Sequence, residues 1–395
     1  MKNFLLKLFD SCSDLFRAWR GFFALQSLES DWRQIVFYAE SRADWAHMEP
    51  IVKQLIEKHA KQITCITSDP ADPVLTNAMP AIRSFYIGSG SARTALFQAL
   101  KAGAFVMTLT DLNAYYLKRS SHPVHYFYIF HALVSTHAAY RQHAFDAYDT
   151  VFCVGRYHEE EIREQEKVYD LKPKTLVEGG YCRLDLLINE VRSRQEKQDN
   201  AEAKHTEPTV LVAPTWGDSS MVGSCVEKIL DCLTGARIRT ILRLHPMTHR
   251  HHPELPDEMR GRYGSSGCFE FDDRLKSIDS LLQADIMIAD HGGSGIEFAF
   301  GLEKPVIWVA TPPKIHNPGR DRIRLPLFED SIRSTTGIEI GTDSLGQLPE
   351  IIRSLYDQAE TWQSRIARLR EKNIFNVGKS AEVMADYIAG HAAAK

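Results

Sequence analysis

The sequence predicts an α/β protein with two domains, each built on a parallel sheet whose strands alternate with helices. Three observations carry this prediction. Short β-branched or aromatic runs alternate with helical segments in two separate series. A polar stretch, residues 191–208, lies between the two series and offers almost nothing to bury. The length of 395 residues fits two cores of roughly 150–200 residues each.

The first element is an amphipathic helix over residues 1–23, within an N-terminal segment of residues 1–30. Large apolar side chains recur there at three- and four-residue steps, and Lys and Arg lie largely elsewhere on the helical wheel. This pattern suits a helix that lies flat on an anionic membrane surface. Asp10 and Asp14 dilute the positive charge, so packing against the protein's own domain stays open as the alternative.

The first domain is predicted over residues 31–190. Its strands are expected at Ile35–Ala39, Ile63–Thr67, Phe105–Thr108, Tyr126–Phe130 and Val151–Val154. Asp44 can cap a helix between the first two strands, which completes a βαβ unit. The first domain is therefore expected to be Rossmann-like.

The second domain is predicted over residues 209–345, after the linker at 191–208, and repeats the first. Its strands are expected at Thr209–Ala213, Thr240–Leu244, Ile286–Ala289 and Val306–Ala310. Residues 346–395 then show helical spacing, so the chain is expected to end in helices.

Composition limits the partners and the compartment. The chain has 47 Lys and Arg against 51 Asp and Glu, a net charge of −4, which provides no basic field for nucleic acid. The seven cysteines are scattered without a CxxC pair, which argues against a disulfide framework or a zinc site. No apolar stretch is long enough to span a bilayer, so we expect a cytoplasmic protein.

The clearest chemical signal is the glycine-rich segment Asp290-His291-Gly292-Gly293-Ser294, between a predicted strand and a predicted helix. Backbone N–H groups and the helix dipole at such a turn suit a phosphate group, and the Ser294 hydroxyl can add a donor. The alternative is a tight turn that needs glycine only to reverse the chain.

Two histidines follow predicted strands, at the sheet edge where open α/β sheets place ligands. His245, in Arg243-Leu244-His245-Pro246, is expected to hydrogen-bond a donor phosphate with help from Arg243. His131 is the general-base candidate for an acceptor hydroxyl. A histidine satisfied by backbone is the alternative at each position, and no metal-binding spacing such as HExxH appears.

Two further loops carry candidate binding residues. Arg183, after a predicted strand, can bind phosphate bidentately or pair with Asp185 to hold its loop. Thr215 and Trp216 end the first strand of the second domain, where a hydroxyl and an aromatic face can meet a nucleotide. The alternative is that Trp216 fills the core.

Taken in order, these segments resemble the CDP-glycerol glycerophosphotransferase family, which includes teichoic-acid polymerases. The family's WHG, GYPRxD, PTWR, RxHP and ADxxITDYSS motifs correspond to Phe130-His131-Ala132, Gly180-Tyr181-Cys182-Arg183-Leu184-Asp185, Pro214-Thr215-Trp216, Arg243-Leu244-His245-Pro246 and Ala284–Asp290, and Lys304-Pro305 follows. The resemblance implies a glycosyltransferase-B-like fold of two Rossmann-like domains facing a cleft, with the donor held mainly by the second domain.

The resemblance also implies the reaction. Glycerophosphate, or a related polyol phosphate, would move from CDP-glycerol or a similar donor to a hydroxyl of a lipid-linked or glycan acceptor, in envelope polysaccharide synthesis. His131 and His245 would be essential, and the protein would associate peripherally with the inner face of the cell membrane. No cofactor or metal is expected, because cationic side chains and a helix terminus can stabilise the developing charge.

The chain departs from the family motifs at several positions. Ala132, Cys182 and Gly217 stand where the family has Gly, Pro and Arg, and Gly292 and Gly293 replace the two serines. Three alternatives therefore stay open: a glycosyltransferase that uses a nucleotide sugar on the same fold, a nucleotide-sugar epimerase, and a non-catalytic envelope-assembly protein.

Overall fold

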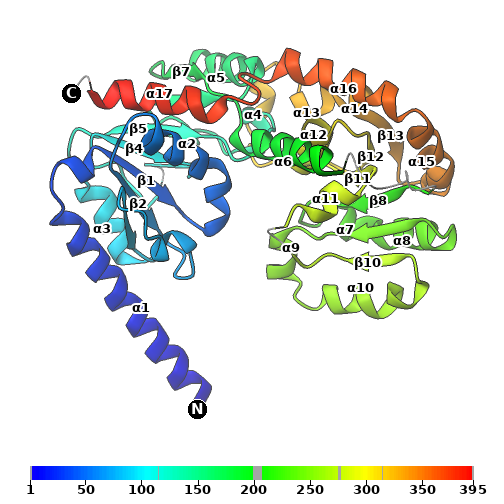
Figure 1. The fold of residues 1–395 in the computed structure, drawn as a ribbon, viewed down its shortest axis with the longest axis horizontal. Helices are drawn as coiled ribbons and strands as arrows, with labels where there is room; N and C mark the ends of the chain where they lie inside the picture. Colours follow the sequence, from blue (N-terminus) through cyan, green and yellow to red (C-terminus); the bar gives the residue numbers. More distant parts are fainter. Residues whose placement is uncertain (1, 114, 199–206, 275–276, 314, 394–395) are drawn as a thin grey trace.

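The computed structural model describes residues 2–113, 115–198, 207–274, 277–313 and 315–393, which form two α/β domains (Figure 1). The first sheet has the strand order β3-β2-β1-β4-β5-β6-β7 and the second has the order β10-β9-β8-β11-β12-β13. Every pair of neighbouring strands is parallel. The predicted fold class is confirmed.

The strands agree with the predicted runs in the middle of both sheets. The first sheet contains β1 (Ile35–Ala39), β2 (Ile63–Thr67), β3 (Ile82–Tyr86), β4 (Ala104–Met107), β5 (His125–Ile129), β6 (Thr150–Cys153) and β7 (Thr175–Glu178). The second sheet contains β8 (Thr209–Val212), β9 (Arg239–Leu242), β10 (Phe269–Phe271), β11 (Ile286–Ala289), β12 (Val306–Ala310) and β13 (Gly337–Gly341). Every residue of β1, β2, β8 and β11 is buried, as expected for parallel strands covered on both faces.

Helices cover both faces of each sheet (Figure 1). Those that begin in the first half of the chain are α1 (Lys2–Gln26), α2 (Trp45–Glu57), α3 (Ser91–Ala99), α4 (Thr136–Ala139), α5 (Arg156–Val168) and α6 (Cys182–Gln198). Those of the second domain are α7 (Met221–Ser224), α8 (Val226–Gly235), α9 (Pro246–His251), α10 (Leu255–Tyr263), α11 (Asp279–Gln283), α12 (Gly293–Leu302), α13 (Phe328–Ser331) and α14 (Arg333–Thr336). The chain ends with α15 (Leu348–Asp357), α16 (Ala359–Asn373) and α17 (Ser380–Ala393).

Helix α1 attaches to the first domain through small side chains. Ala18 and Leu25 are buried, and a Cβ added at Gly21 would overlap the Tyr86 carbonyl oxygen. The helix therefore approaches the backbone of β3 closely, since glycine has no side chain to hold the two apart. From this contact α1 extends away from the domain, beyond α3 (Figure 1).

Part of the predicted linker at 191–208 is helical. Helix α6 continues to Gln198, and residues 199–206 lie outside the described residues. The polar composition of this stretch predicts a linker because it offers little to bury. Its Glu, Arg, Gln and Lys residues are nevertheless good helix formers, and Arg194 pairs with Glu190 one turn earlier.

The last helix returns to the first domain. Met384 and Ile388 of α17 join the buried cluster that contains Ile51 of α2. Lys58, just after α2, forms ion pairs with Glu382 and Asp386 of α17. The chain thus crosses between the domains twice, through α6 and again before α17. Within the described ranges, every helix falls short of the length and apolarity that crossing a bilayer demands.

Candidate active site

The glycine-rich start of α12 and the segment after β5 meet where the two domains join. A Cβ added at Gly293 would lie 3.7 Å from both the Ala132 Cβ and the Leu133 backbone nitrogen. The Tyr181 hydroxyl lies 3.0 Å from the His131 carbonyl oxygen and 2.6 Å from Glu297 Oε1. Predicted motifs far apart in the sequence, one from each domain, therefore form one site.

Close packing beneath α12 explains one glycine of its first turn, Gly295. A Cβ at Gly295 would lie 2.5 Å from the Trp308 ring, so only glycine lets this helix rest on β12. Ser294 is exposed at the first turn, and the Thr215 hydroxyl faces Gly292 at 3.5 Å from the position of an added Cβ. Free N–H groups at a helix start, flanked by two hydroxyls, form an arrangement suited to an anion.

Asp290 shapes this site from below. The side chain is 2% exposed and accepts hydrogen bonds from the backbone nitrogens of Thr215 at 2.8 Å and Met221 at 2.7 Å. Burial raises the pKa of Asp290, although these hydrogen bonds oppose the shift. Asp290 thus fixes the loop that carries Thr215, and both of its carboxylate oxygens accept hydrogen bonds from backbone donors.

His291 is held between backbone and a cation. Its Nε2 lies 2.6 Å from the Thr311 carbonyl oxygen, and Arg333 donates to its Nδ1 at 2.6 Å. Burial, followed by the positive charge of Arg333, lowers the pKa of His291. A neutral ring that donates from Nε2 and accepts at Nδ1 satisfies both contacts. This geometry gives His291 a protein partner on each side.

His131 keeps an exposed surface at the domain junction. Desolvation by the surrounding chain lowers its pKa, while Asp44, a hydrogen bond to the Thr108 backbone and Glu297 act in the opposite direction. The ring is therefore neutral near pH 7, which is the form that can accept a proton. His131 lies where a general base for an acceptor hydroxyl is expected.

His47 is a neighbour that the sequence analysis did not single out. It is 7% exposed, and its ring centroid lies 6.4 Å from that of His131 and 5.4 Å from that of Tyr181. Its Nδ1 is buried and has no hydrogen-bond partner among the described residues. Burial, His131 and Arg183 hold the pKa of His47 well below its ordinary value. In the sequence, His47 stands out as a polar residue four positions before Ile51, on the core-facing side of the helix predicted there.

Arg183 projects from the first turn of α6 toward the second domain. Its Nε donates to Glu297 Oε2 at 2.8 Å, so the alternative of pairing with Asp185 is wrong. Asp185 instead accepts from the backbone nitrogens of Gly378 and Ser380, before α17. Neither terminal guanidinium nitrogen of Arg183 makes a hydrogen bond to the part of the chain that the structure describes. A cation with unused donors thus stands at the junction.

His245 begins α9 and caps it. Its Nδ1 accepts a hydrogen bond from the Met247 backbone nitrogen at 3.1 Å, so a neutral ring carries its proton on Nε2 as a donor. Trp216 lies alongside, with its ring centroid 6.3 Å from that of His245, and it stacks on His251 at 5.8 Å. Trp216 is half-buried, so it does not fill the core.

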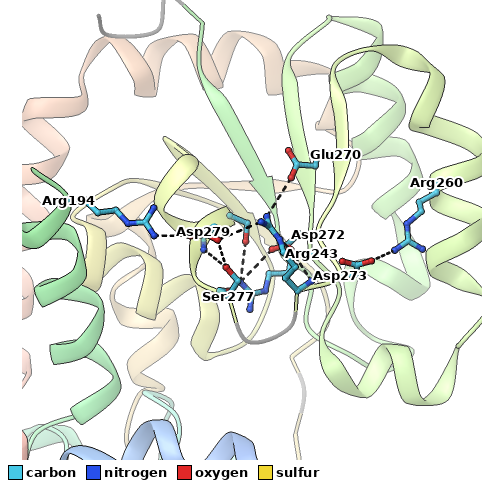
Figure 2. A network of polar contacts seen from close by, with 10 residues as sticks. Arg194, Arg243, Arg260, Glu270, Asp272, Asp273, Ser277 and Asp279 are labelled. Atoms are coloured by element: carbon cyan, nitrogen blue, oxygen red, sulfur yellow. Dashed lines mark hydrogen bonds and ion pairs between the residues drawn. The ribbon is translucent and has the colours of Figure 1, made fainter. Parts of the chain in front are cut away.

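Arg243 serves the second domain's own structure. Its NH1 donates to the Ser277 carbonyl oxygen at 2.7 Å and to Ser280 Oγ at 3.2 Å, and it lies 3.9 Å from Asp272 Oδ2. Figure 2 shows Arg243 enclosed by this polar network. These NH1 contacts hold the segment after β10.

No group of three or more His, Cys, Asp or Glu side chains that could hold a metal ion occurs among the described residues. The positive groups of the site belong to the chain itself. They are the start of α12 and the Arg183 guanidinium.

Two parallel-sheet domains with the site at their junction define a glycosyltransferase-B-like fold. The family described as CDP-Glycerol:Poly(glycerophosphate) glycerophosphotransferase matches residues 113–320, which is more than half of the chain. The chain belongs to this family, and it is a transferase of the CDP-glycerol glycerophosphotransferase type.

Solved structures show a similar fold. The wall teichoic acid polymerase TagF has a TM-score of 0.62 at 14% identity, covering 100% of this chain and 98% of that chain. A TagF structure soaked with CDPG has a TM-score of 0.63 at 15% identity, covering 100% and 96%. The Methanocaldococcus jannaschii UDP-GlcNAc 2-epimerase in complex with UDP-GlcNAc and UDP has a TM-score of 0.56 at 13% identity, covering 90% and 99%. No curated protein matches the chain.

Proposed function

We propose that this protein transfers glycerophosphate from CDP-glycerol to a hydroxyl of a lipid-linked or glycan acceptor in envelope polysaccharide synthesis, and releases CMP. Family membership supports the donor and the reaction type. The observation that carries the proposal is the contact between Gly293 and Ala132, which brings the anion-binding helix start of one domain beside the base candidate of the other.

The donor pyrophosphate is placed at the Gly292–Ser294 start of α12. There the free backbone N–H groups and the helix dipole favour negative charge, and the Thr215 hydroxyl faces the same turn. Arg183 adds its terminal nitrogens from the first domain, and His245 donates through Nε2. Together these groups stabilise the charge that develops on the leaving CMP, so the proposal includes no metal requirement.

The chemical step is a displacement at the β-phosphorus. The acceptor oxygen forms a bond to phosphorus as the bond to the CMP oxygen breaks. The acceptor's proton moves to His131, whose low pKa keeps it neutral and ready to accept. Asp290, His291 and Arg243 are proposed as positioning residues, because each already has protein partners.

A nucleotide-release assay tests the proposal. Purified protein is incubated with CDP-glycerol and a membrane extract, beside His131→Ala, His245→Ala and the exposed control His252→Ala. We expect CMP release that is lost in the first two variants, by about 100-fold or more, and kept in the control. Release of UDP from a nucleotide sugar, without CMP from CDP-glycerol, would instead establish the glycosyltransferase alternative. Epimerisation of UDP-GlcNAc would establish the epimerase alternative. Absence of activity with every donor would establish the non-catalytic alternative.

We also propose that the protein works on the inner face of the cell membrane, since a lipid-linked acceptor is confined there. Residues 1–23 are the proposed attachment. Ala18 and Leu25 of α1 pack against the first domain, so the proposed attachment uses the opposite side of this helix.

A further inference from the structure

His47 lies beside the base candidate with its polar atoms unused. Its side chain is 7% exposed, and its Nδ1 is closed to solvent and has no hydrogen-bond partner among the described residues. Its Nε2 likewise forms no hydrogen bond to the described part of the chain, but this atom is not closed to solvent. A buried polar group without a partner costs free energy, so its presence at the domain junction calls for a physical reason.

The fold fixes the position of the His47 ring. His47 lies in the first turn of α2, which follows β1 at the carboxyl edge of the first sheet. The turn before this helix is closed by a hydrogen bond from the Ser41 backbone nitrogen to Asp44 at 2.8 Å. On the other side, the Tyr181 ring packs against His47, with the two ring centroids 5.4 Å apart. The ring is therefore held in place before any ligand enters.

The environment determines which nitrogen of His47 carries the proton. Burial is the largest cause of the low pKa of His47, and the positive charges of His131 and Arg183 act in the same direction, so the ring is neutral near pH 7. A neutral imidazole has one N–H donor and one acceptor nitrogen. A buried N–H without a partner is rarer in proteins than a buried acceptor without one. The proton is therefore expected on Nε2, which makes this atom a donor to a molecule at the junction.

His131 offers the complementary group. Its ring forms a hydrogen bond to the Thr108 backbone, which opposes the fall of its pKa. The Tyr128 hydroxyl lies 3.5 Å from the His131 Nδ1, which is beyond the usual length of a hydrogen bond. A neutral His131 that donates to Thr108 thus keeps its other ring nitrogen as an acceptor.

The spacing of the two imidazole rings suits one oxygen atom. Their centroids are 6.4 Å apart and their planes meet at 71°. Two hydrogen bonds of about 2.8–3.0 Å each to a shared oxygen cover a gap of this order. A hydroxyl group has one O–H donor and two acceptor lone pairs, so it can satisfy His47 and His131 at the same time.

We propose that His47 is a residue of the acceptor site, where its Nε2–H donates to the oxygen of the acceptor hydroxyl while the O–H of the same group donates to His131. The inference rests on the proposed function for the reaction that follows. In that reaction the hydroxyl proton moves to His131, the oxygen forms its bond to phosphorus, and the electron pair of the broken bond leaves with the CMP oxygen. His47 keeps its proton throughout and holds the attacking oxygen in line.

Three substitutions at position 47 test this hydrogen bond. The amide nitrogen of Gln has about the reach of Nε2, that of Asn has about the reach of Nδ1, and Phe keeps only the ring. CMP release from CDP-glycerol is measured over a range of concentrations of glycerol, which serves as the hydroxyl acceptor. We expect kcat/KM for glycerol to fall about 10- to 100-fold in His47→Phe and His47→Asn, and to be largely restored in His47→Gln.

Two controls accompany these variants. His59→Phe, just beyond the other end of α2, removes an imidazole that pairs with Asp386 and should leave kcat/KM for glycerol unchanged. Equilibrium binding of CDP-glycerol should be the same in the parent and all four variants, because the donor is held mainly by the second domain. A His47 variant that loses CDP-glycerol binding while its KM for glycerol is unchanged would overturn the inference and place His47 on the donor side.

A structural role for His47 predicts the opposite order of activities. Phe preserves the packing against Tyr181, whereas Gln does not. Parent-like kcat/KM in His47→Phe, or no recovery in His47→Gln relative to His47→Phe, would therefore overturn the inference.

A spectroscopic measurement separates this inference from the proposed function. Long-range ¹H–¹⁵N spectra of the histidine-labelled parent, assigned with His47→Gln, report which ring nitrogen holds the proton. We expect a protonated Nε2 whose resonance shifts when glycerol is added. A proton on Nδ1, or no shift with glycerol, overturns the inference whether or not CMP is released. A parent that shows the expected tautomer and shift but releases no CMP refutes the proposed function and keeps the hydroxyl site.

Discussion

Replacing Arg183 by glutamine separates a donor-binding role from a structural one. In the structure, Nε of Arg183 is engaged by Glu297, while its two terminal nitrogens have no hydrogen-bond partner among the described residues. A guanidinium that serves only to hold Glu297 would not need these nitrogens. If they contact the pyrophosphate, the variant loses at least one charge-assisted hydrogen bond, which contributes about 1.5–3 kcal/mol.

This loss corresponds to a fall in kcat/KM for CDP-glycerol of about 10- to 100-fold. The assay is steady-state CMP release over a range of donor concentrations. Arg183→Lys keeps the charge but loses the planar fork, so an intermediate value is expected. Arg194→Gln is the matched control, because Arg194 lies on the same helix and pairs with Glu190 and Asp279 instead.

Thermal stability does not discriminate between the two roles, since either one predicts a lower Tm when the partner of Glu297 is removed. Kinetics does. If Arg183→Gln has the parent's kcat and donor KM within about twofold, a margin well below the loss of one such bond, the donor-binding reasoning is refuted and Arg183 is a structural residue.

Three further predictions follow from the same geometry. Because desolvation lowers the pKa of His131, kcat/KM should be flat near pH 7 and should fall only as the pH drops through a value below about 6.5. A fall in kcat/KM on acidification that begins above about pH 6.5 would contradict the assignment of His131 as the base. Asp290→Ala leaves two backbone N–H groups without their acceptor and should lower the unfolding free energy by about 1–3 kcal/mol for each, measured by urea denaturation. Gly295→Ala pushes a methyl group against Trp308 and should cost about 1–3 kcal/mol, whereas Gly261→Ala, with open space at its Cβ, should be neutral or stabilising.

The central strands were predictable from the sequence, but only one of the four terminal strands was: β7, which matches the strand predicted just before Arg183. Three strands absent from the prediction, β3, β10 and β13, are all terminal strands of their sheets. Their residues are less completely buried than those of central strands, as in Phe269-Glu270-Phe271, where Glu270 is exposed and both Phe side chains are half-buried. The continuous apolar run that identifies a central parallel strand does not form there.

The site was predictable as a set of segments and less so as a set of side chains. Motif spacing led to His131 and to the α12 start, because each follows a central strand at the carboxyl edge of its own sheet. The same spacing did not reveal that Asp290 and His291 point at protein partners. His47 was missed because its position on α2 has the periodicity of a core residue, and only the fold places it beside His131.

The relation between the two halves of the site is set by buried contacts just after His131. The Ser135 backbone nitrogen donates to Glu329 at 2.9 Å, and the Phe328 nitrogen donates to the Ser135 hydroxyl at 2.7 Å. The Tyr157 ring stacks on Phe328 at 3.8 Å, and burial raises the pKa of Glu329. A buried carboxyl and a stacked aromatic pair tolerate little displacement, since separating them exposes apolar surface and unpaired polar groups together. The segment that carries the base candidate is thus fixed to the second domain four residues downstream, so its approach to α12 follows from packing already present in the protein rather than from donor binding.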